Sequence, residues 1–411
     1  MDMKNICVVG GGIVGSAIAA RLIGDGHAVT LFEAEPEGLP ASAGNAALIA
    51  LPEIAPIASP GMLTAVPKWL IDPLGPLTLR WQDVPALLPW LLAFLAASTP
   101  QRGERARHAL TGLMRTALAD HQQLGALAGL AGHLRQTGFI SVHDSQTSLD
   151  GARREAEQVR ALLGYDFEAI SPVAARDMVP QLEGEFFGAL HQPGYWMVSN
   201  PLNVLRQYQD FIRSRGQLVP GKVLSLGQQD IGIAVGIQGG HELIFDQVIV
   251  SAGVWSRELV RGLGIKVLLE NERGYNTTYS DLNWNLAMPV GFADHGFVAV
   301  PLVDGLRVGG AVELAKPDTS LNFARAKAMR EKMRRYVPSL PEGGKEWMGR
   351  RPSTPDSLPV IDSHPGDSRI LYAFGHGHLG LTLSAVTARL IAGLVNGTDM
   401  VTPAFSIGRF Q

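Results

Sequence analysis

The N-terminal stretch NICVVGGGIVGSAIAARLIGDGHAVTLFEAE contains two apolar runs separated by a segment with helical spacing. Residues 6–9 form a β-branched, apolar run, which predicts a buried strand. Residues 13–23 place small and apolar side chains at helical intervals, and the turn GDGH ends this helix. The run AVTLFE predicts a second buried strand. The pattern therefore predicts a strand–helix–strand unit with two parallel strands.

The remainder of the chain alternates between stretches in which a helical pattern predominates and stretches in which a strand pattern predominates. From about residue 60 to 196, proline-rich turns and helices predicted at 105–130 and 149–163 surround the short strand GFISVH. The helix LNVLRQYQDFIRSRG and the short strands KVLSLG, IGIAVGI and ELIFDQVIVSAG follow. GYNTTYS, GFVAVPL and LRVGGAVEL predict antiparallel strands, and a last helix is expected near 321–336. This order predicts two domains that the chain visits alternately.

Composition and charge limit the classes of protein to which this chain can belong. A chain of 411 residues that is 46% hydrophobic and 18% charged is expected to be globular, with room for two cores. Its formal net charge of -3 gives no support to nucleic-acid binding. The single cysteine, Cys7, excludes an intramolecular disulfide and favours a reducing compartment. No secretory signal is evident in MDMKNICVVG, so we expect a cytoplasmic protein.

The segment VPALLPWLLAFLAAS, residues 84–98, is almost entirely apolar. It is shorter than the roughly 20 residues that a membrane-spanning helix needs, and Pro85 and Pro89 interrupt its first turns. We favour a buried helix or a helix that covers a cleft. A patch that touches the surface of a membrane is the alternative.

The glycines of GGGIVG fit the pattern G-x-G-x-x-G, with Gly10, Gly12 and Gly15 at the key positions. The first permits the tight turn, the second lets the backbone approach a pyrophosphate at the helix N-terminus, and the third lets the helix pack on the strand. Glu33 ends the second strand, where a carboxylate can accept hydrogen bonds from ribose hydroxyls. These residues predict a dinucleotide, NAD or FAD, and the carboxylate argues against the 2′-phosphate of NADP.

Two later features bear on the choice between these cofactors. The buried strand DQVIV ends in Ser251-Ala252-Gly253, whose small side chains leave space at the C-terminal edge of a parallel sheet. In YAFGHGHLGLTLSAVTARL a second glycine-rich turn separates a strand from a helix. A pyrophosphate needs one helix N-terminus, so the second suits a flavin ring, whose N1–C2=O edge becomes negative on reduction. His376 and His378 are therefore interpreted as part of a backbone cradle rather than as metal ligands or bases.

With these motifs the chain resembles the FAD-dependent D-amino acid oxidase superfamily, in particular its bacterial D-amino acid dehydrogenase branch. The resemblance covers nearly the whole length. It rests on the glycine fingerprint with Glu33 and on ASAGNAALI, SAGVWS, ERGY, GLRVGGAVEL, GRRPSTPDSLPVID and GHGHLGLT. The chain departs from the usual pattern at Ala47, where a glycine is expected, and at Ser357 and Asp362, where PDGLPVIG is typical.

The resemblance implies an α/β fold with a Rossmann-like FAD-binding domain and a second domain of antiparallel sheet plus helices that binds substrate. The expected bounds are 1–60, 197–262 and 347–411 for the FAD-binding domain, and 61–196 and 263–346 for the substrate-binding or cap domain. FAD is expected to be non-covalent. The residues assigned to it are Gly10, Gly12, Ile13, Val14, Gly15, Glu33, Ala34, Ser42, Asn45, Ala46, Ala47, Val223, Ala252, Gly253, Trp255, Gly377, His378, Leu379, Gly380, Leu381 and Thr382.

Three residues are expected at the reacting centre. By resemblance, the arginine before the proline in GRRP, Arg351, clamps the substrate carboxylate, a role that suits the fork of a guanidinium. A surface or interdomain salt bridge is the alternative for Arg351. Tyr275 either donates its hydroxyl to the carboxylate or packs in the sheet, and Tyr279 is a weaker candidate of the same type. His378 is expected near the substrate mainly through its main chain.

The reaction implied is oxidative deamination of a D-amino acid to a 2-oxo acid and ammonia, by hydride transfer from Cα to flavin N5. Electrons then pass to a quinone or another acceptor. The alternative is a relative that acts on a cyclic or N-substituted amino acid, such as D-proline, hydroxyproline, sarcosine or an opine, alone or in a complex. An NAD-dependent dehydrogenase and a flavin-binding subunit without turnover of its own are the competing classes. The sequence predicts no metal site and leaves the oligomeric state open.

Overall fold

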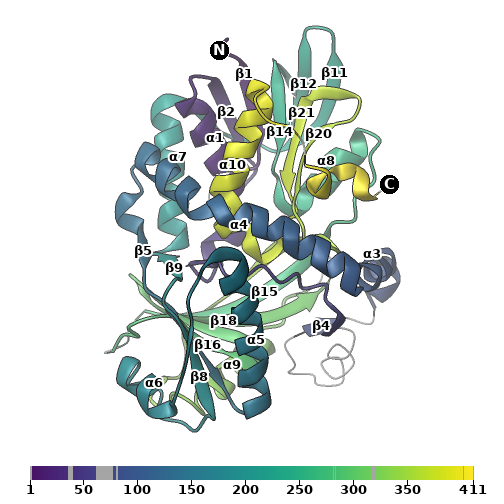
Figure 1. The fold of residues 1–411 in the computed structure, drawn as a ribbon. Helices are drawn as coiled ribbons and strands as arrows, with labels where there is room; N and C mark the ends of the chain where they lie inside the picture. Colours follow the sequence, from purple (N-terminus) through teal and green to yellow (C-terminus); the bar gives the residue numbers. More distant parts are fainter. Residues whose placement is uncertain are drawn as a thin grey trace.

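The computed structural model describes residues 2–35, 40–61, 77–79, 82–280, 282, 284–315, 320–400 and 402–410. Two main sheets lie at opposite ends of the molecule, and a long helix crosses between them (Figure 1). The predicted strand–helix–strand unit is confirmed as β1 (Asn5–Val9), α1 (Ile13–Gly24) and β2 (Ala28–Glu33), with β1 and β2 parallel. The α/β fold class expected from the sequence is therefore correct.

The first main sheet has the strand order β10-β2-β1-β14-β21-β20. Its parallel strands are joined by an antiparallel edge strand, β20. Ile6 and Val8 pack into one core, while Cys7 and Val9 pack into another, because successive side chains of a strand point to opposite faces. The added strands are β10 (Gln217–Pro220), β14 (Gln247–Val250), β20 (Val360–His364) and β21 (Asp367–Phe374).

Different elements cover the two faces of this sheet. The first face carries α1 together with α7 (Pro201–Arg215) and α10 (Gly380–Asn396), whose buried side chains belong to the larger core. The second face packs against a small antiparallel sheet. That small sheet consists of β11 (Val223–Gln229), β12 (Gly232–Ile237) and β13 (His241–Phe245). The sheet is thus buried on both sides, as parallel sheets generally are.

The second main sheet has the order β19-β15-β18-β17-β16-β6-β8-β7, with β4 also paired to β18. Helices α6 (Pro172–Met178) and α9 (Ala324–Met333) pack on its outer face. Its strands are β4 (Leu77–Leu79), β6 (Phe139–His143), β7 (Glu168–Ile170), β8 (Gly188–Gln192), β15 (Glu270–Tyr279), β16 (Val290–Phe292), β17 (Phe297–Leu302), β18 (Gly305–Leu314) and β19 (Lys345–Ser353). A further small sheet joins β3 (Leu48–Ile49), β9 (Trp196–Val198) and β5 (Leu134–Gln136).

The expected domain bounds and the sheets divide the chain differently in two places. Strand β19 lies in the second main sheet, although residues 347–353 fall in the stretch expected to bind FAD. Helix α4 (Pro100–Ala128) packs against α1 and α10, although the cap domain was expected to contain it. Amphipathic spacing indicates that a helix forms but does not say which sheet it will cover. The bounds themselves stay a prediction, and residues 62–76, 80–81, 281, 283 and 316–319 of the cap stretches lie outside the described residues.

The apolar segment at 84–98 forms α3 (Val84–Ala97), which meets α4 at an angle of 89°. Leu87 and Trp90 are buried against Leu314, so one face of α3 covers the second main sheet. The opposite face is open: Leu88, Leu92 and Leu95 are 49%, 58% and 50% exposed. The prediction of a covering helix therefore holds for one face, and the other face remains an exposed apolar stripe.

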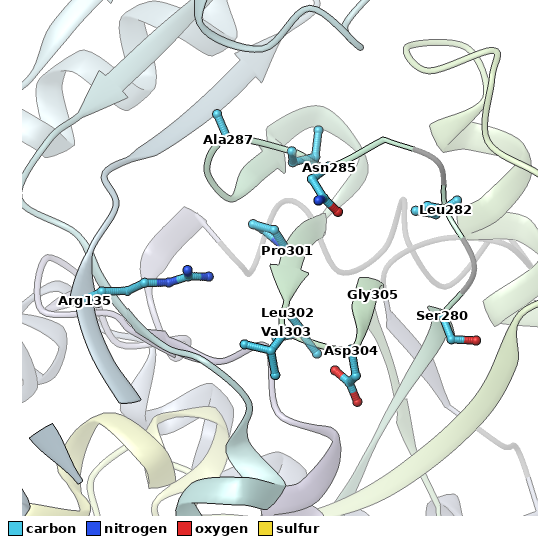
Figure 2. Close-up of a pocket in the computed structure, with 11 residues that line it drawn as sticks. Arg135, Ser280, Leu282, Asn285, Ala287, Pro301, Leu302, Val303, Asp304 and Gly305 are labelled. Carbon is cyan, nitrogen blue, oxygen red and sulfur yellow. The ribbon is translucent and has the colours of Figure 1, made fainter. Parts of the chain in front are cut away.

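The described residues line two cavities, and the first of them lies away from the residues expected to bind flavin and substrate, whereas Leu381 of the expected flavin residues lines the second. The first, of about 400 Å³, opens between the β17–β18 turn and Ser280, Leu282 and residues 285–287, and Arg135 of β5 faces it (Figure 2). None of the residues predicted for the site lines this cavity. The second, of about 230 Å³, is bounded by α4, α7, β9 and the first turns of α10, where Leu381 and Ser384 line it.

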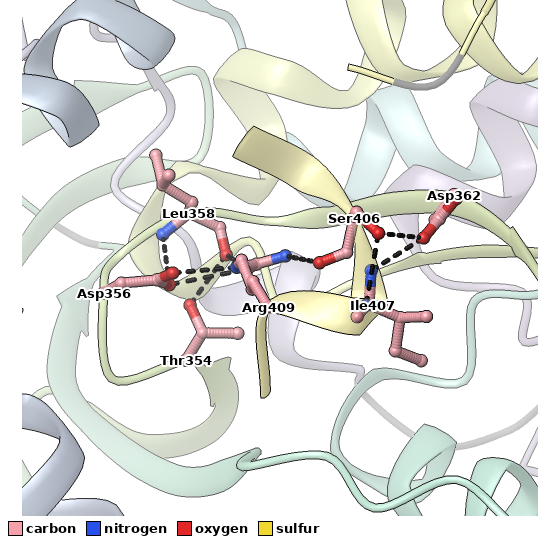
Figure 3. Close-up of polar contacts among 8 residues, drawn as sticks. Thr354, Asp356, Leu358, Asp362, Ser406, Ile407 and Arg409 are labelled. Atoms are coloured by element: carbon pink, nitrogen blue, oxygen red, sulfur yellow. Dashed lines mark hydrogen bonds and ion pairs between the residues drawn. The ribbon is translucent and has the colours of Figure 1, made fainter. Parts of the chain in front are cut away.

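Two aspartates of the GRRPSTPDSLPVID segment hold the C-terminal turns (Figure 3). Asp362, which stands where a glycine is typical, accepts hydrogen bonds from Ser406 Oγ and from the Ile407 backbone N–H, both at 2.7 Å. Arg409 donates from Nε to Asp356 at 2.8 Å and from Nη2 to the Leu358 carbonyl at 2.6 Å. The departure from the family pattern at Asp362 is therefore a structural anchor for the chain terminus.

Replacing Asp362 with alanine should lower the free energy of unfolding by about 2–3 kcal/mol, since the three hydrogen bonds that its buried side chain accepts, one of them from the Ser363 N–H, are lost. Urea denaturation followed by circular dichroism measures the change. Asp210→Ala is the matched control, because the ion pair of Asp210 with Arg213 is exposed and contributes little. Equal losses of unfolding free energy in the two variants would contradict the proposed role of Asp362 as an anchor for the C-terminal turns.

Candidate functional site

The turn between β1 and α1 has the shape of a pyrophosphate site. Gly10 has φ of +106°, and a Cβ there would lie 2.5 Å from the Ser251 carbonyl oxygen. A Cβ on Gly15 would lie 2.0 Å from the Gly10 carbonyl oxygen, so the helix packs directly on the turn. Gly12 differs: among the described residues, the nearest atom to its Cβ position is Ser42 Oγ, at 3.7 Å. The backbone at Gly12 therefore borders open space.

The first turn of α1 carries no acidic side chain beside this space. Gly12 is the N-cap and makes no side-chain capping bond. The Ile13 N–H donates to Ser42 Oγ at 3.0 Å, and Val14 follows in the same turn. The positive end of a helix dipole beside an open glycine is a site for phosphate. These residues fit the pyrophosphate of a dinucleotide.

Glu33 has a fixed carboxylate at the carboxyl end of β2. Its Oε2 accepts from the Gly11 N–H at 2.7 Å, and its Oε1 accepts from the Glu35 N–H at 3.0 Å. Ala34 lies exposed beside it. Val223, at the start of β11, is buried in the same core as Phe32. The carboxylate is thus oriented at the edge where a ribose is expected.

The loop that contains Ser42, residues 41–47, is held from the opposite sheet. Arg307 of β18 donates through Nη1 to the carbonyls of Asn45 at 2.6 Å and Ala43 at 3.1 Å, and burial lowers the pKa of Arg307 to about 10. Asn276 of β15 donates to the Gly44 carbonyl at 2.9 Å. Ala46 packs on the larger core beside this loop. The two main sheets therefore meet at the loop, and their relative position fixes it.

Ala47 adopts φ of +59°, a left-handed conformation that favours glycine. Its N–H donates to Asn45 Oδ1 at 2.9 Å, and its side chain is fully buried. Ser357 has φ of +65°. The glycines expected at these positions from the resemblance therefore correspond to real backbone demands, which this chain meets with other residues.

The Ser251-Ala252-Gly253 turn follows β14 and faces the same edge of the first main sheet. Gly253 has φ of +58° and begins a short 3-10 helix, η3 (Gly253–Trp255). Trp255 is 49% exposed, and the Arg350 guanidinium lies 5.9 Å from the centre of its ring. Arg350 therefore faces Trp255, as expected of an arginine that does not take part in the clamp.

The GHGHLG segment forms a second turn before a helix N-terminus. Gly377 has φ of +53° and starts the 3-10 helix η5 (Gly377–Leu379), which runs into α10 at Gly380. Among the described residues, the nearest atom to a Cβ on Gly380 is His376 Cβ at 3.8 Å. Thr382 Oγ1 accepts from the Ala50 N–H at 3.0 Å and so joins α10 to the loop after β3. The segment has the open backbone that a cradle requires.

The two histidines of this segment have different surroundings. His376 is buried, its Nε2 lies 2.9 Å from Thr387 Oγ1, and burial lowers its pKa to about 3. It is therefore neutral at physiological pH. His378 is partly exposed, and its Nε2 lies 3.3 Å from Glu53 Oε2. Within the part of the chain that the structure describes, no group of three or more His, Cys, Asp or Glu is placed to hold a metal ion.

Arg351 lies on β19, directly across from Glu272 of β15. Its Nη1 donates to Glu272 Oε1 at 2.9 Å, and its side chain is 29% exposed. Strand β19 packs against the Ala41–Gly44 turn, η3 and η5. The structure thus places Arg351 on the strand that borders the three loops assigned to the cofactor. Its ion pair with Glu272 lies within one sheet and joins residues that were expected to belong to different domains, so the salt bridge considered as an alternative is present and the clamp role of Arg351 stays a prediction.

Tyr275 lies on the other face of β15, because side chains alternate along a strand and Glu272 is three positions away. Its hydroxyl donates to Glu313 Oε2 at 2.6 Å, and burial, with that hydrogen bond, raises its pKa. Tyr279 belongs to the same outer core. In this structure Tyr275 packs in the sheet, which is the alternative considered for it, and a contact with the substrate carboxylate stays a prediction.

Sequence reasoning missed the residues that surround Arg351. Glu272 and Gly274 belong to the motif ERGY, which on its own assigns no role to either residue. Ser353 Oγ donates to Glu272 Oε2 at 2.8 Å, and Trp90 Nε1 of α3 donates to the Ser353 carbonyl at 3.0 Å. Strand alternation around Arg351 would have indicated Ser353, but the register between β15 and β19 is not readable from one sequence.

Comparisons with known proteins identify relatives that match nearly the whole chain. A family model described as "DAO: FAD dependent oxidoreductase" matches residues 5–394. The chain is 31% identical to a D-amino-acid oxidase of Bradyrhizobium diazoefficiens, over 99% of both chains. It is 28% identical to a D-amino acid dehydrogenase of Methylobacterium nodulans, over 95% of both chains.

Solved structures share the fold across nearly the whole chain. Glycine oxidase from Geobacillus kaustophilus matches with a TM-score of 0.73 and 22% identity, over 99% of both chains. Iminodiacetate oxidase from a Chelativorans species matches with a TM-score of 0.75 and 18% identity, over 97% of both chains. L-alpha-glycerophosphate oxidase from Mycoplasma pneumoniae, solved with FAD bound, matches with a TM-score of 0.71 and 17% identity, over 99% of this chain and 98% of that one. With its glycine turn, ordered Glu33 and second helix N-terminus, the chain belongs to the DAO family of FAD-dependent oxidoreductases.

Proposed function

We propose that this protein oxidises D-amino acids to 2-oxo acids and ammonia with non-covalently bound FAD. The observation that carries the proposal is Arg351, a partly exposed guanidinium on the strand that borders the cofactor loops. Glu272 engages its Nη1, which leaves the Nε–Nη2 edge to take a carboxylate through two parallel hydrogen bonds. An amino acid brings both a carboxylate and an oxidisable Cα–H, so one clamp orients the bond that reacts.

The residues of the chain supply binding and orientation. The α1 N-terminus and Gly12 would hold the pyrophosphate, Glu33 the ribose, and the backbone of residues 377–382 the pyrimidine edge of the flavin. Bound FAD supplies a two-electron acceptor that takes hydride from Cα. Arg351 fixes the carboxylate so that Cα–H points toward the cradle. No protein base is needed if the amine enters neutral, and water then hydrolyses the released imino acid.

The choice of D-amino acids rests on the relatives of higher identity. The two relatives above are named for D-amino acids, at 31% and 28% identity. Structures named for glycine, L-proline and L-amino acids lie below 25% identity and support only the fold. A cyclic or N-substituted amino acid would use the same carboxylate clamp, so the test below includes both classes.

An anaerobic bleaching screen tests the substrate class without assuming an electron acceptor. Purified yellow protein is mixed with D-, L-, cyclic and N-substituted amino acids, and loss of flavin absorbance near 450 nm is followed. D-amino acids should bleach the flavin fastest and yield a 2-oxo acid and ammonia. Bleaching only by cyclic or N-substituted compounds would replace the proposed substrate. A colourless protein that releases no flavin on denaturation would overturn the whole proposal.

The non-covalent attachment of FAD agrees with the state of Cys7. This thiol is buried in β1, and burial raises its pKa far above the ordinary value, so it is a poor nucleophile. Acid precipitation should therefore release all of the flavin into the supernatant. Flavin that stays with the precipitated protein would contradict non-covalent binding.

We also infer that electrons pass to a quinone at a membrane surface, with the protein bound peripherally on the cytoplasmic side through α3. The helix carries no charged residue, and its exposed stripe of leucines is apolar. Arg102 and Arg105 lie exposed just beyond it, on α4, where anionic lipid headgroups would meet them. Trp90, on the inner face of α3, contacts the strand that bears Arg351.

Replacing Leu88, Leu92 and Leu95 together with serine should abolish co-flotation with vesicles that contain anionic lipid and slow reduction of a vesicle-borne quinone. Reduction of a soluble dye should be unchanged, since these side chains point away from the second main sheet. Leu224→Ser with Ile231→Ser is the matched control on the small sheet, where both side chains are exposed. Wild-type protein that does not bind vesicles would refute the membrane contact.

A further inference from the structure

We propose that Glu272 is the positioning residue of the carboxylate clamp, and that Gly274 provides the surface on which the Arg351 guanidinium lies. Glu272 holds Nη1 so that the Nε–Nη2 edge is presented to the substrate. The inference rests on the proposed role of Arg351. It adds two residues of β15 that must be present for Arg351 to bind in one orientation.

The register of the sheet places Glu272 and Arg351 on one face. The two residues are directly paired across the antiparallel β15 and β19, so their side chains project from the same side. Glu272 is buried, with a side chain only 8% exposed, whereas that of Arg351 is 29% exposed. The carboxylate is therefore the inner, fixed partner of the pair, and the guanidinium reaches from it toward the open side.

Both carboxylate oxygens of Glu272 are engaged. Oε1 accepts from Arg351 Nη1 at 2.9 Å, and Oε2 accepts from Ser353 Oγ at 2.8 Å. A carboxylate held at both oxygens cannot rotate freely, and it transmits this restraint to the guanidinium. Because Nη1 is taken, the side-on edge formed by Nε and Nη2 is the fork that faces an incoming carboxylate.

Gly274 allows the guanidinium to lie flat on the strand. A Cβ at this position would lie 2.6 Å from Arg351 Nη2 and 2.8 Å from both Nε and Cζ. Similar distances to three atoms of the planar group mean that the missing side chain would stand under its face. Any side chain at this position would displace the edge that is to bind substrate, since real Cβ contacts are not this short.

Ser353 connects this arrangement to the cradle. Its backbone forms an isolated bridge with His376, the residue before Gly377. Its carbonyl accepts from Trp90 Nε1 at 3.0 Å, and its hydroxyl holds Glu272. The clamp and the flavin cradle are therefore joined through one residue, which fixes the distance between the bound carboxylate and the segment expected to hold the flavin.

The test measures carboxylate binding as well as turnover. Propionate, which has a carboxylate but no amine to oxidise, is titrated into the holoenzyme while the flavin spectrum is recorded, with calorimetry as a second measurement. Glu272→Gln should weaken propionate about tenfold, because an uncharged amide holds Nη1 less firmly. KM for a D-amino acid should rise by a similar factor, with a smaller change in kcat, and flavin content should be unchanged. Gly274→Ala should weaken propionate more than Glu272→Gln does.

Matched variants separate positioning from stability. Glu270→Gln removes a charge from the same strand, where Glu270 pairs with Arg257 at 2.6 Å. Gly291→Ala introduces a Cβ 2.6 Å from the Phe139 ring, on the same sheet but away from Arg351. Both controls should lower the melting temperature without changing propionate affinity. If the controls weaken propionate as much as the test variants do, Glu272 and Gly274 act only through the fold.

The direction in which Glu272→Gln changes the affinity for propionate also tests the inference. Tighter propionate binding would mean that Glu272 competes with substrate for Arg351, and the positioning role would be wrong. The Arg351→Ala variant separates this inference from the proposed function. Loss of propionate binding in Arg351→Ala with unchanged binding in Glu272→Gln removes only the positioning role. Unchanged binding in Arg351→Ala removes the clamp itself.

Discussion

Arg351→Ala is expected to lower kcat/KM for a D-amino acid by roughly 100- to 10,000-fold while flavin content stays at the wild-type level. Two charge-assisted hydrogen bonds, each contributing about 1.5–3 kcal/mol, would be lost from the substrate carboxylate. Steady-state kinetics with an artificial acceptor measures the loss, and the ratio of absorbance at 450 nm to protein gives the flavin content. Flavin should be retained because Arg351 lies on the second main sheet, apart from the glycine turn and Glu33.

Arg350→Ala is the control for this prediction. The neighbouring arginine lies over the Trp255 ring rather than beside Glu272, so its removal should change kcat/KM by only a few-fold. Unchanged turnover and unchanged KM in Arg351→Ala would show that the substrate carboxylate binds elsewhere. A loss of flavin in Arg351→Ala would instead assign Arg351 to the cofactor.

Gly12→Val is expected to fold and to lose FAD, with affinity weakened by at least about 100-fold, since the side chain would occupy the pyrophosphate space. The backbone at Gly12, with φ of -68° and ψ of -179°, accepts any residue. The Cβ also has room, with Ser42 Oγ as its nearest neighbour at 3.7 Å. Titration of apoprotein with FAD measures the affinity, and circular dichroism verifies the fold.

Valine substitutions at two other glycines serve as controls for Gly12→Val. Gly15→Val should fail to fold properly, because a Cβ there would lie 2.0 Å from the Gly10 carbonyl oxygen. Gly112→Val, on the exposed side of α4, has no described atom within 4 Å of its Cβ and should keep full flavin. A yellow Gly12→Val protein with wild-type affinity would rule out the pyrophosphate site at the α1 N-terminus.

Much of the fold was predictable because local patterns determine local elements. The glycine turn with its flanking strands, the helices at α4, α5 (Gln146–Leu163), α7 and α9, and the antiparallel strands all carry clear periodicity. Helix α4 begins at Pro100, earlier than predicted, because Thr99 precedes a proline that fits the first turn. Which sheet α4 would cover was not predictable, since that depends on contacts between residues far apart in the sequence.

The candidate site was predictable where backbone alone is involved. Glycines mark turns and open backbone directly, so Gly10, Gly12 and Gly377 could be assigned from one sequence. Tyr275 could not, because its role depends on which face of β15 it occupies. The role of Glu272 was not predictable for the same reason. Glu272 lies opposite Arg351 only because of the register between β15 and β19, which one sequence does not show.

The position of β21 has a consequence for biosynthesis. This strand, from near the C-terminus, lies inside the first main sheet between β14 and β20, and the turn that follows it leads into α10. A nascent chain therefore cannot complete this sheet, or form the second helix N-terminus, until β21 and the first turns of α10 have been synthesised. We expect FAD to be incorporated only after these elements have been synthesised, and chains truncated before β21 to remain without flavin and with β14 exposed as an unpaired edge.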